Sequence, residues 1–500
     1  MPTAKERTAR IADLRWRTYL TAKCNDEHEP YFPADGTYYS SCGYFRRSGL
    51  AEIRDFWRRT TALMRAGKAP REIGLYVHWP FCVSRCRFCF CSMGAARGSA
   101  EMRDYAAGIR REIDALRGLF HEVEFSSVYF GGGTPTLAPD GVLDDLLGHI
   151  SRSFRLRPDA ELYVEASPGT LTASKLKLLL RRGVNRITLG VQSLDPAVLR
   201  RSDRRGQTRA AVNAALRRLT AARGVYSGVE LMFGLEGQTL RSFLRDLDDI
   251  MRRGLDAVYL FGFDPRPQTP FAQAGQTLSP RIREGKVRLL PALERLARLY
   301  GYRTPSGQAE SPGYLRTISS QCRVARRNGA SILGLGAGAL SHAFGAAWYR
   351  HPPIEETRRR WDRALPFFCM ESPPAEEMRG FAVRHLYAQG SIPRGEFRRL
   401  FGCDVLDTPL ARPLHAAQRE GLIRTNGEAV SFTGTDRAQR LVFSKRLYSP
   451  RLHRRLKAAH HKDFQAFNRR HSDRDIRAFL PVADKQIAAM MTTFERCRKD

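Results

Sequence analysis

Three cysteines in one short loop carry the strongest chemical signal in this sequence. Cys82, Cys86 and Cys89 have the spacing C-x3-C-x2-C within the stretch from Tyr76 to Cys91. Three thiolates packed this tightly suit a soft metal centre such as an iron–sulfur cluster. A four-iron cluster that only transfers electrons is normally closed by four cysteines. Three ligands leave one iron open to a substrate or cosubstrate, so the spacing predicts chemistry at the cluster itself.

Two other uses of these thiols agree less well with the sequence. A zinc site usually needs a second pair of cysteines, and no second CxxC occurs in the chain. Structural disulfides are typical of secreted proteins, whereas residues 1–7 lack the apolar core of a signal peptide. Four of the ten cysteines lie at 82–91, which fits a reducing compartment, so we expect a cytoplasmic protein.

The composition limits the classes of protein that the chain can form. Its 500 residues allow two or three domains, and a hydrophobic fraction of 42% is enough for a core. No run of 18 apolar residues occurs, so we expect no membrane-spanning helix. The formal charge of +32 is spread along the whole chain rather than gathered in one tail or stripe. We therefore expect no nucleic-acid partner.

From residue 73 onward, short β-branched or aromatic runs alternate with longer helical patterns. The predicted strands are 73–78, 127–130, 161–165, 186–191, 228–233 and 257–263. The predicted helices between them are 102–119, 141–154, 172–182, 208–223 and 239–253. Six β–α units in succession imply an α/β fold, with a parallel sheet covered by helices. Periodicity alone leaves open whether the sheet is doubly wound or forms a barrel.

Several motifs, in their order and spacing, resemble those of the radical S-adenosylmethionine (SAM) superfamily. Within it, they resemble the oxygen-independent coproporphyrinogen III oxidase-like branch. The motifs are the cysteine loop at 76–91, FGGGTPT at 130–136, VEASP at 164–168, LGVQS at 189–193, LMFGL at 231–235 and GLGAGALS at 334–341. The resemblance implies a partial (β/α)6 barrel whose active site lies at the carboxyl ends of the strands.

The resemblance also gives a domain plan for the chain. A β-hairpin is predicted around Asn426-Gly427, a strong turn dipeptide, in a region that resembles the small winged-helix-like domain of the family. The plan begins with an N-terminal extension (1–72) and the barrel with its closing segment (73–345). A linker (346–374), the winged-helix-like domain (375–440) and a basic helical tail (441–500) follow.

Roles for residues at the strand ends follow from the same resemblance. It implies a [4Fe-4S] cluster on the three cysteines, whose open iron is chelated by SAM. Glycines let a backbone approach a small ligand closely, so Gly132, Gly133 and Thr134 are expected at the amino group of SAM. Tyr76 is expected near SAM, with packing in the barrel core as its alternative. The other expected SAM contacts are Phe88, Glu165, Gln192, Arg204 and Glu230.

Three further residues are expected near the reaction. Cys91 extends the loop to a C-x-C ending, as in the oxidases of the branch, and is either a redox or hydrogen-transfer group or an idle thiol. His342 follows the glycine-rich segment 334–341 and is either a base active near neutral pH or a structural histidine after a turn. Gln268 is expected, together with that segment, at a second SAM molecule.

Three activities fit the branch. We expect a class C radical SAM methyltransferase or cyclopropane-forming enzyme, in which two SAM molecules add a methyl or methylene group to an sp2 carbon. Its substrate would be a flat aromatic or peptide-derived natural-product intermediate. The alternatives are coproporphyrinogen III oxidative decarboxylation and a haem-binding chaperone. Residues 261–271 and 305–333 lack sequences expected of the oxidase, and Cys91 argues against the chaperone. We also expect a monomer that receives electrons from a donor such as flavodoxin or ferredoxin.

Overall fold

The structure is a computed structural model of the chain, and it describes most of residues 46–459. The described ranges are 46–91, 94–263, 269–276, 295–303, 313–315, 330–359, 367–434 and 443–459, together with a few single positions. Contacts divide the chain into two compact units. One unit is Arg46–Glu371, and the other is Ser372–Asp500 with Met1–Phe45. The first unit contains the predicted parallel sheet.

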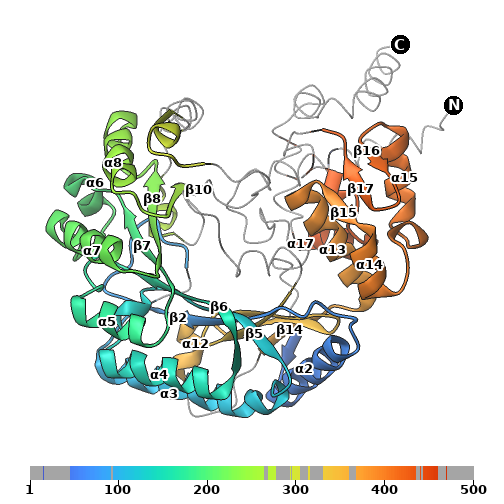
Figure 1. The fold of residues 1–500 in the computed structure, drawn as a ribbon, viewed down its shortest axis with the longest axis horizontal. Helices are drawn as coiled ribbons and strands as arrows, with labels where there is room; N and C mark the ends of the chain where they lie inside the picture. Colours follow the sequence, from blue (N-terminus) through green and yellow to red (C-terminus); the bar gives the residue numbers. More distant parts are fainter. Residues whose placement is uncertain are drawn as a thin grey trace. The chain divides into compact units, whose positions relative to one another are not determined.

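Six parallel strands form the centre of the first unit. They pair in chain order and run in one direction (Figure 1). These strands are β2 (Ile73–Trp79), β5 (Glu124–Gly132), β6 (Arg155–Ala166), β7 (Arg186–Gln192), β8 (Tyr226–Phe233) and β9 (Ala257–Gly262). Each corresponds to one predicted strand, so the predicted α/β fold is confirmed. Helices cover one face of the sheet and polar groups fill the other, which explains why the strands are rich in buried residues.

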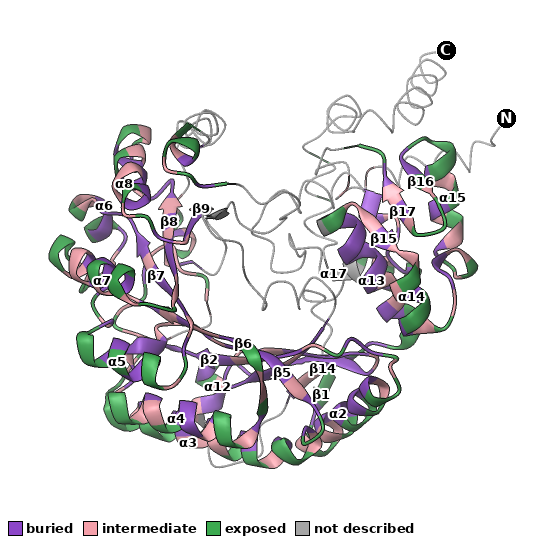
Figure 2. Ribbon diagram, viewed as in Figure 1, coloured by how far each residue is buried: buried purple, intermediate pink, exposed green. Residues whose placement is uncertain are grey.

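All five predicted helices lie on the outer side of the curved sheet. They are α3 (Ser99–Leu116), α4 (Asp140–Ser153), α5 (Ala173–Arg181), α7 (Arg209–Ala221) and α8 (Leu240–Arg252). Their buried residues face the sheet and their exposed residues face outward (Figure 2). Three begin after a threonine whose hydroxyl accepts a backbone N–H of the first turn, at Thr172, Thr208 and Thr239. A short sixth helix, α6 (Pro196–Arg201), was not predicted.

The sheet continues beyond both ends of this parallel core. β11 pairs parallel with β2, four antiparallel strands follow it, and β10 pairs antiparallel with β9. Residues 346–374, expected to form a linker, instead supply two of these strands and helix α12 (Ile354–Arg359). Part of the expected N-terminal extension also packs here, because Trp57 of α2 (Leu50–Arg65) donates a hydrogen bond to the hydroxyl of Tyr349 at 2.7 Å. The added strands, in sheet order, are β1 (Arg46–Ser48), β14 (Phe367–Glu371), β13 (Ala347–Arg350), β12 (Leu340–Ala343), β11 (Ser331–Leu335) and β10 (Gly313–Leu315).

Polar side chains gather on the inner face of the curved sheet, near the amino ends of β7 and β8. The guanidinium of Arg186, which is 2% exposed, lies 3.3 Å from a carboxylate oxygen of Glu161 and donates to the hydroxyl of Tyr259. Its central carbon lies 5.0 Å from the ring centre of Tyr163 and 4.5 Å from that of Tyr226. We call these five residues the floor cluster. A buried charge requires pairing and hydrogen bonds, and the floor cluster supplies both.

The second unit combines helices with a three-stranded antiparallel sheet of order β15-β17-β16. The hairpin predicted at Asn426-Gly427 is present, and the side-chain oxygen of Asn426 accepts the N–H groups of Glu428 and Ala429. Most of the expected helical tail lies outside the described residues. The elements are α13 (Pro374–Gln389), β15 (Ser391–Pro393), α14 (Arg394–Phe401), α15 (Ala411–Arg419), β16 (Ile423–Thr425), β17 (Ala429–Phe432) and α17 (Pro450–Ala459). Among the helices described in either unit, none has the length and apolar content needed to span a membrane.

Candidate functional site

The cysteine loop lies directly after β2, at the carboxyl end of the central strands. Cys82 ends the short strand β3 (Phe81–Cys82), and the N–H of Cys89 donates to the carbonyl of Cys86 at 3.0 Å, which closes a turn. In the described part of the chain, no three His, Cys, Asp or Glu side chains are grouped closely enough to hold a single metal ion. A four-iron cluster takes each protein ligand at a separate corner, so it does not require such close grouping.

A second loop, between α6 and α7, holds the cysteine loop in place. The hydroxyl of Ser84 donates to the carbonyl of Asp203 at 3.0 Å, and the N–H of Arg87 donates to the carbonyl of Ser202 at 3.0 Å. The same second loop carries Arg204. Arg204, which was expected to contact SAM, therefore lies directly beside the cysteines.

The thiols of the loop differ in their readiness to lose a proton. Burial raises the pKa of Cys82 to about 12, although the hydroxyl of Thr134 opposes this shift from 3.1 Å. Burial also raises the pKa of Cys86. A hydrogen bond from the thiol of Cys91 lowers the pKa of Cys89 below its ordinary value, and the same bond and burial raise the pKa of Cys91 well above its ordinary value. Bound iron would displace the protons, because metal ligation requires thiolates.

Glycines end β5 where this strand passes the end of β2. A Cβ on Gly132, whose φ is +105°, would lie 2.5 Å from the ring of His78, and a Cβ on Gly133 would lie 2.6 Å from a backbone oxygen. Only glycine fits at these two positions. The close approach sets the hydroxyl of Thr134 at 3.1 Å from the sulfur of Cys82. The glycine motif and the first cysteine therefore form one continuous surface.

Polar side chains converge at the ends of β7 and β8. The amide nitrogen of Gln192 lies 3.4 Å from a carboxylate oxygen of Glu230. Arg204 donates to the carbonyl of Gly190, and its guanidinium lies 3.7 Å from the sulfur of Cys86. The side-chain oxygen of Gln192 is buried and accepts no hydrogen bond from the described residues. A buried acceptor of this kind calls for a donor, and a ribose hydroxyl of SAM would supply one.

A chain of aromatic rings connects β2 to Glu165 at the end of β6. The hydroxyl of Tyr129 donates to Glu165, and its ring lies 5.2 Å from that of Tyr76. The hydroxyl of Tyr76 lies 2.8 Å from Nδ1 of His78. Sequence reasoning missed Tyr129 and His78. The two-residue alternation of β2 and β5 was the available signal, because it turns both side chains to the same face as Tyr76.

The structure places the other predicted residues near the loop differently from one another. Cys91 lies beside Cys89, as its hydrogen bond shows. Gln268 lies outside the described residues. Phe88 packs against an apolar cluster of Val198, Leu235, Phe263 and Phe271.

His342 is not part of the site. It pairs across strands with Ile332, which in turn pairs with Gly74 at the start of β2, so it lies toward the opposite end of the sheet from the cysteine loop. Its buried ring stacks on Trp348 with centres 4.0 Å apart. The expectation of a catalytic base fails because β12 runs antiparallel to β11 and carries His342 away from the strand ends.

Residues 76–250, which contain the cysteine loop and the ends of β5 to β8, match the family model described as the Radical SAM superfamily. Over this segment the chain is similar to the radical SAM superfamily. Radical SAM proteins use a [4Fe-4S] cluster and SAM, so the two cofactors predicted from the sequence are confirmed.

Curated relatives fall into three named groups, one of which is named only as radical S-adenosyl methionine domain-containing protein 1. The oxygen-independent coproporphyrinogen III oxidase of Bradyrhizobium diazoefficiens is 30% identical over 295 residues, which are 55% of this chain and 63% of that protein. The heme chaperone HemW of Escherichia coli is 34% identical over 176 residues, which are 35% of this chain and 46% of that protein. The chain thus spans about half the length of the curated relatives that it matches.

A solved structure has the same fold over most of both chains. It is the coproporphyrinogen III oxidase (HemN) from Escherichia coli, described as a radical SAM enzyme. The TM-score is 0.65 at 22% identity, over 78% of this chain and 93% of that chain. This similarity confirms the expected partial barrel of the radical SAM fold.

The expected methyl or methylene transfer to a natural-product intermediate is wrong, because the relatives are named as coproporphyrinogen oxidases and heme chaperones. That expectation rested on departures from the oxidase at 261–271 and 305–333. Both segments lie outside the matched residues 76–250, and residues 264–268 of the first and most positions of the second lie outside the described residues. The second SAM molecule was required only by methyl transfer and is not carried further.

Proposed function

We propose that the chain is a radical SAM oxidoreductase that acts on a propionate-bearing tetrapyrrole, in the manner of an oxygen-independent coproporphyrinogen III oxidase. The observation that carries this choice is the fourth thiol of the loop. Cys91 gives the loop a C-x-C ending, which resembles that of the oxidases of the branch. Its thiol also hydrogen-bonds to Cys89. The similarity to curated oxidases at 29–32% identity supports the same choice.

Within this proposal, the cysteine loop holds the cluster and the strand ends hold SAM. Cys82, Cys86 and Cys89 ligate three irons. The glycine motif with Thr134 binds the amino group of SAM, and Arg204 neutralises its carboxylate. The side chains that face the ribose and adenine belong to Tyr76, Glu165, Gln192 and Glu230.

When bound, the cluster and SAM supply one-electron cleavage and removal of a hydrogen atom from a carbon–hydrogen bond. Loss of that hydrogen atom and of one electron converts a propionate side chain into a vinyl group and carbon dioxide. The reaction therefore needs an electron acceptor, and SAM cleavage needs an electron donor such as flavodoxin or ferredoxin. The residues of the chain would orient SAM against the open iron. Holding the reacting groups in this fixed orientation raises the rate.

A heme chaperone is the second candidate, because HemW of Escherichia coli is 34% identical over 176 residues. A chaperone would bind haem and pass it to an acceptor protein without decarboxylating a porphyrinogen. The two candidates therefore differ in what they consume.

One anaerobic experiment separates them. The full chain with reconstituted cluster is incubated with SAM, a limiting amount of dithionite, an added one-electron acceptor and coproporphyrinogen III, and mass spectrometry follows 5′-deoxyadenosine and the tetrapyrrole. The oxidase predicts that both 5′-deoxyadenosine and decarboxylated tetrapyrrole increase together. Cys91→Ser is run in parallel, because it keeps the three proposed ligands and removes only the fourth thiol.

Two results would count against the oxidase. Intact cluster with no decarboxylated product would overturn it. Stoichiometric binding of haemin, followed by its transfer to an apo acceptor with no loss of SAM, would replace it with the chaperone.

A further inference from the structure

The backbone at Gln192 is held in an uncommon conformation. Gln192 ends β7 with φ of +68°, in the left-handed region that residues other than glycine rarely adopt. Such a strained backbone persists only where several surrounding contacts hold it in that conformation. The peptide groups next to Gln192, those of Val191, Ser193 and Leu194, should therefore be held by other parts of the chain.

Gln207, in the loop that leads to α7, holds two of these groups. Its amide nitrogen donates to the carbonyl of Val191 at 2.7 Å and to that of Ser193 at 3.1 Å. Its amide oxygen accepts a hydrogen bond from Nε of Arg204 at 2.7 Å. One side chain thus joins the backbone on both sides of Gln192 to the guanidinium that lies beside the cysteine loop.

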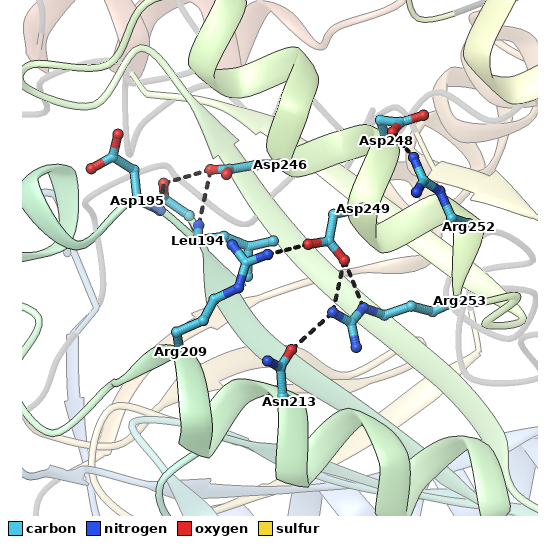
Figure 3. A network of polar contacts seen from close by, with 10 residues as sticks. Leu194, Asp195, Arg209, Asn213, Asp246, Asp248, Asp249, Arg252 and Arg253 are labelled. Carbon is cyan, nitrogen blue, oxygen red and sulfur yellow. Dashed lines mark hydrogen bonds and ion pairs between the residues drawn. The ribbon is translucent and has the colours of Figure 1, made fainter.

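Asp246, on α8, holds the same turn from its other side. One carboxylate oxygen accepts the hydroxyl of Ser193 at 2.7 Å and the N–H of Leu194 at 2.9 Å (Figure 3). Asp246 is 6% exposed, and burial raises its pKa. A carboxylate is kept in this costly place by the two donors that it satisfies.

We propose that Gln207 and Asp246 are positioning residues for SAM. Together they fix the turn that presents the amide of Gln192, and Gln207 also sets the orientation of the Arg204 guanidinium. Neither side chain contacts the proposed ligand directly. The inference rests on the proposed function, because it assumes that Gln192 and Arg204 contact SAM. In metal sites, partners that orient the ligating groups contribute about 10–100-fold in affinity, and we expect a similar effect on SAM.

The test measures the dissociation constant of SAM by equilibrium dialysis on the full chain with reconstituted cluster. Gln207→Leu should weaken SAM binding by about tenfold or more, with unchanged iron content. Gln207→Glu keeps the acceptor for Arg204 and loses both donors, so it isolates the contribution of the turn. Asp246→Leu should weaken binding by about tenfold, whereas Asp246→Asn, whose oxygen can accept both hydrogen bonds, should stay within about twofold.

Asp249→Asn is the matched control on the same helix. Asp249 pairs with Arg209 and Arg253 and makes no contact with the turn in the network drawn (Figure 3). Its variant should bind SAM as the parent does.

Each outcome separates the inference from the proposed function. Parent-like SAM binding by both Gln207→Leu and Asp246→Leu would overturn the inference and leave the SAM site intact. Absence of SAM binding in the parent with full iron content would refute the proposed site instead. If Leu variants lose cluster iron, Gln207→Glu decides, and parent-like affinity in that folded variant overturns the role of the two donors.

Discussion

The two ends of the barrel interior are built by the same strands and differ in their chemistry. In the floor cluster, Arg186 lies against Glu161 and three tyrosines, so a buried cation is matched by groups of the protein itself. At the strand ends, Glu165 accepts from a tyrosine, Glu230 lies beside an amide, and the buried oxygen of Gln192 accepts no hydrogen bond from the described residues. The floor cluster pairs its buried charges within the protein, whereas the strand ends hold a buried acceptor, the side-chain oxygen of Gln192, that a ligand could meet.

The comparison shows that a single strand contributes side chains both to the floor cluster and to the candidate site. β6 gives Glu161 and Tyr163 to the floor cluster and Glu165 to the strand ends, because alternate residues face the same side of a strand. β7 likewise begins with Arg186 and ends with Gln192. Substitutions at the two ends should therefore separate stability from activity.

The largest effect is expected when the strand ends lose a cluster ligand. Cys89→Ala removes one of the three proposed thiolates, so 5′-deoxyadenosine formation should fall about 1,000-fold or more, which corresponds to about 4 kcal/mol of barrier. Iron analysis and nucleoside quantification under anaerobic conditions are the measurements. Cys403→Ser, in the second unit, is the control and should retain both iron and product. Full iron content in Cys89→Ala would show that Cys89 is not a ligand.

A substitution in the floor cluster should act on stability instead. Arg186→Met leaves Glu161 buried without its cation, so the free energy of unfolding should fall by about 3–5 kcal/mol. Urea denaturation measures the loss. Arg182→Met is the control, because its pair with Asp144 is partly exposed and should cost less than about 1 kcal/mol. The double variant with Glu161→Leu should recover part of the loss; no recovery would mean that the unpaired carboxylate is not its cause.

Glu165→Gln should give the opposite pattern to Arg186→Met. The amide still accepts the hydrogen bond of Tyr129 but loses the charge proposed to meet SAM. We expect SAM affinity to fall about 30-fold, or about 2 kcal/mol, with little change in the urea midpoint. Equilibrium dialysis is the measurement, and Glu122→Gln, at an exposed pair with Arg65, is the control. A large loss of stability with parent-like affinity would reverse the assignment of Glu165.

The smallest effect is expected at Thr134. Thr134→Val keeps the shape of the side chain and removes the hydroxyl that lies 3.1 Å from the sulfur of Cys82. One neutral hydrogen bond contributes about 1 kcal/mol, so SAM affinity should fall about fivefold. Thr134→Ser, which restores the hydroxyl, should bind SAM nearly as the parent does. Equal affinities in the valine and serine variants would remove the hydroxyl from the proposed site.

The central strands and helices could be predicted because their signals are local. Apolar runs mark the buried strands, and threonine caps mark the starts of α5, α7 and α8. The added strands could not be predicted in this way. Residues 367–369 pair with 46–48, more than 300 positions away, and β11 pairs with β2 across more than 250 positions. Pairing over such distances leaves no periodic signal within either segment.

The candidate site shows the same limit. The cysteine and glycine motifs are compact in sequence, so Cys82 and Thr134 could be named before the fold was known. His342 was misplaced because a glycine-rich segment does not reveal the direction in which the next strand runs. Gln207 and Asp246 gave no signal, because their role depends on hydrogen bonds to the backbone of a turn.

Within the described residues, the sheet has twelve strands and ends on each side in a strand of only three residues, β1 and β10. Long exposed strand edges act as templates for aggregation, because their unpaired backbone groups can bind a strand of another molecule. At one edge, β1 carries Arg46 and Arg47, both exposed, and a run of charge opposes such pairing. An incomplete barrel can therefore stay open for its chemistry without becoming a starting point for fibrils.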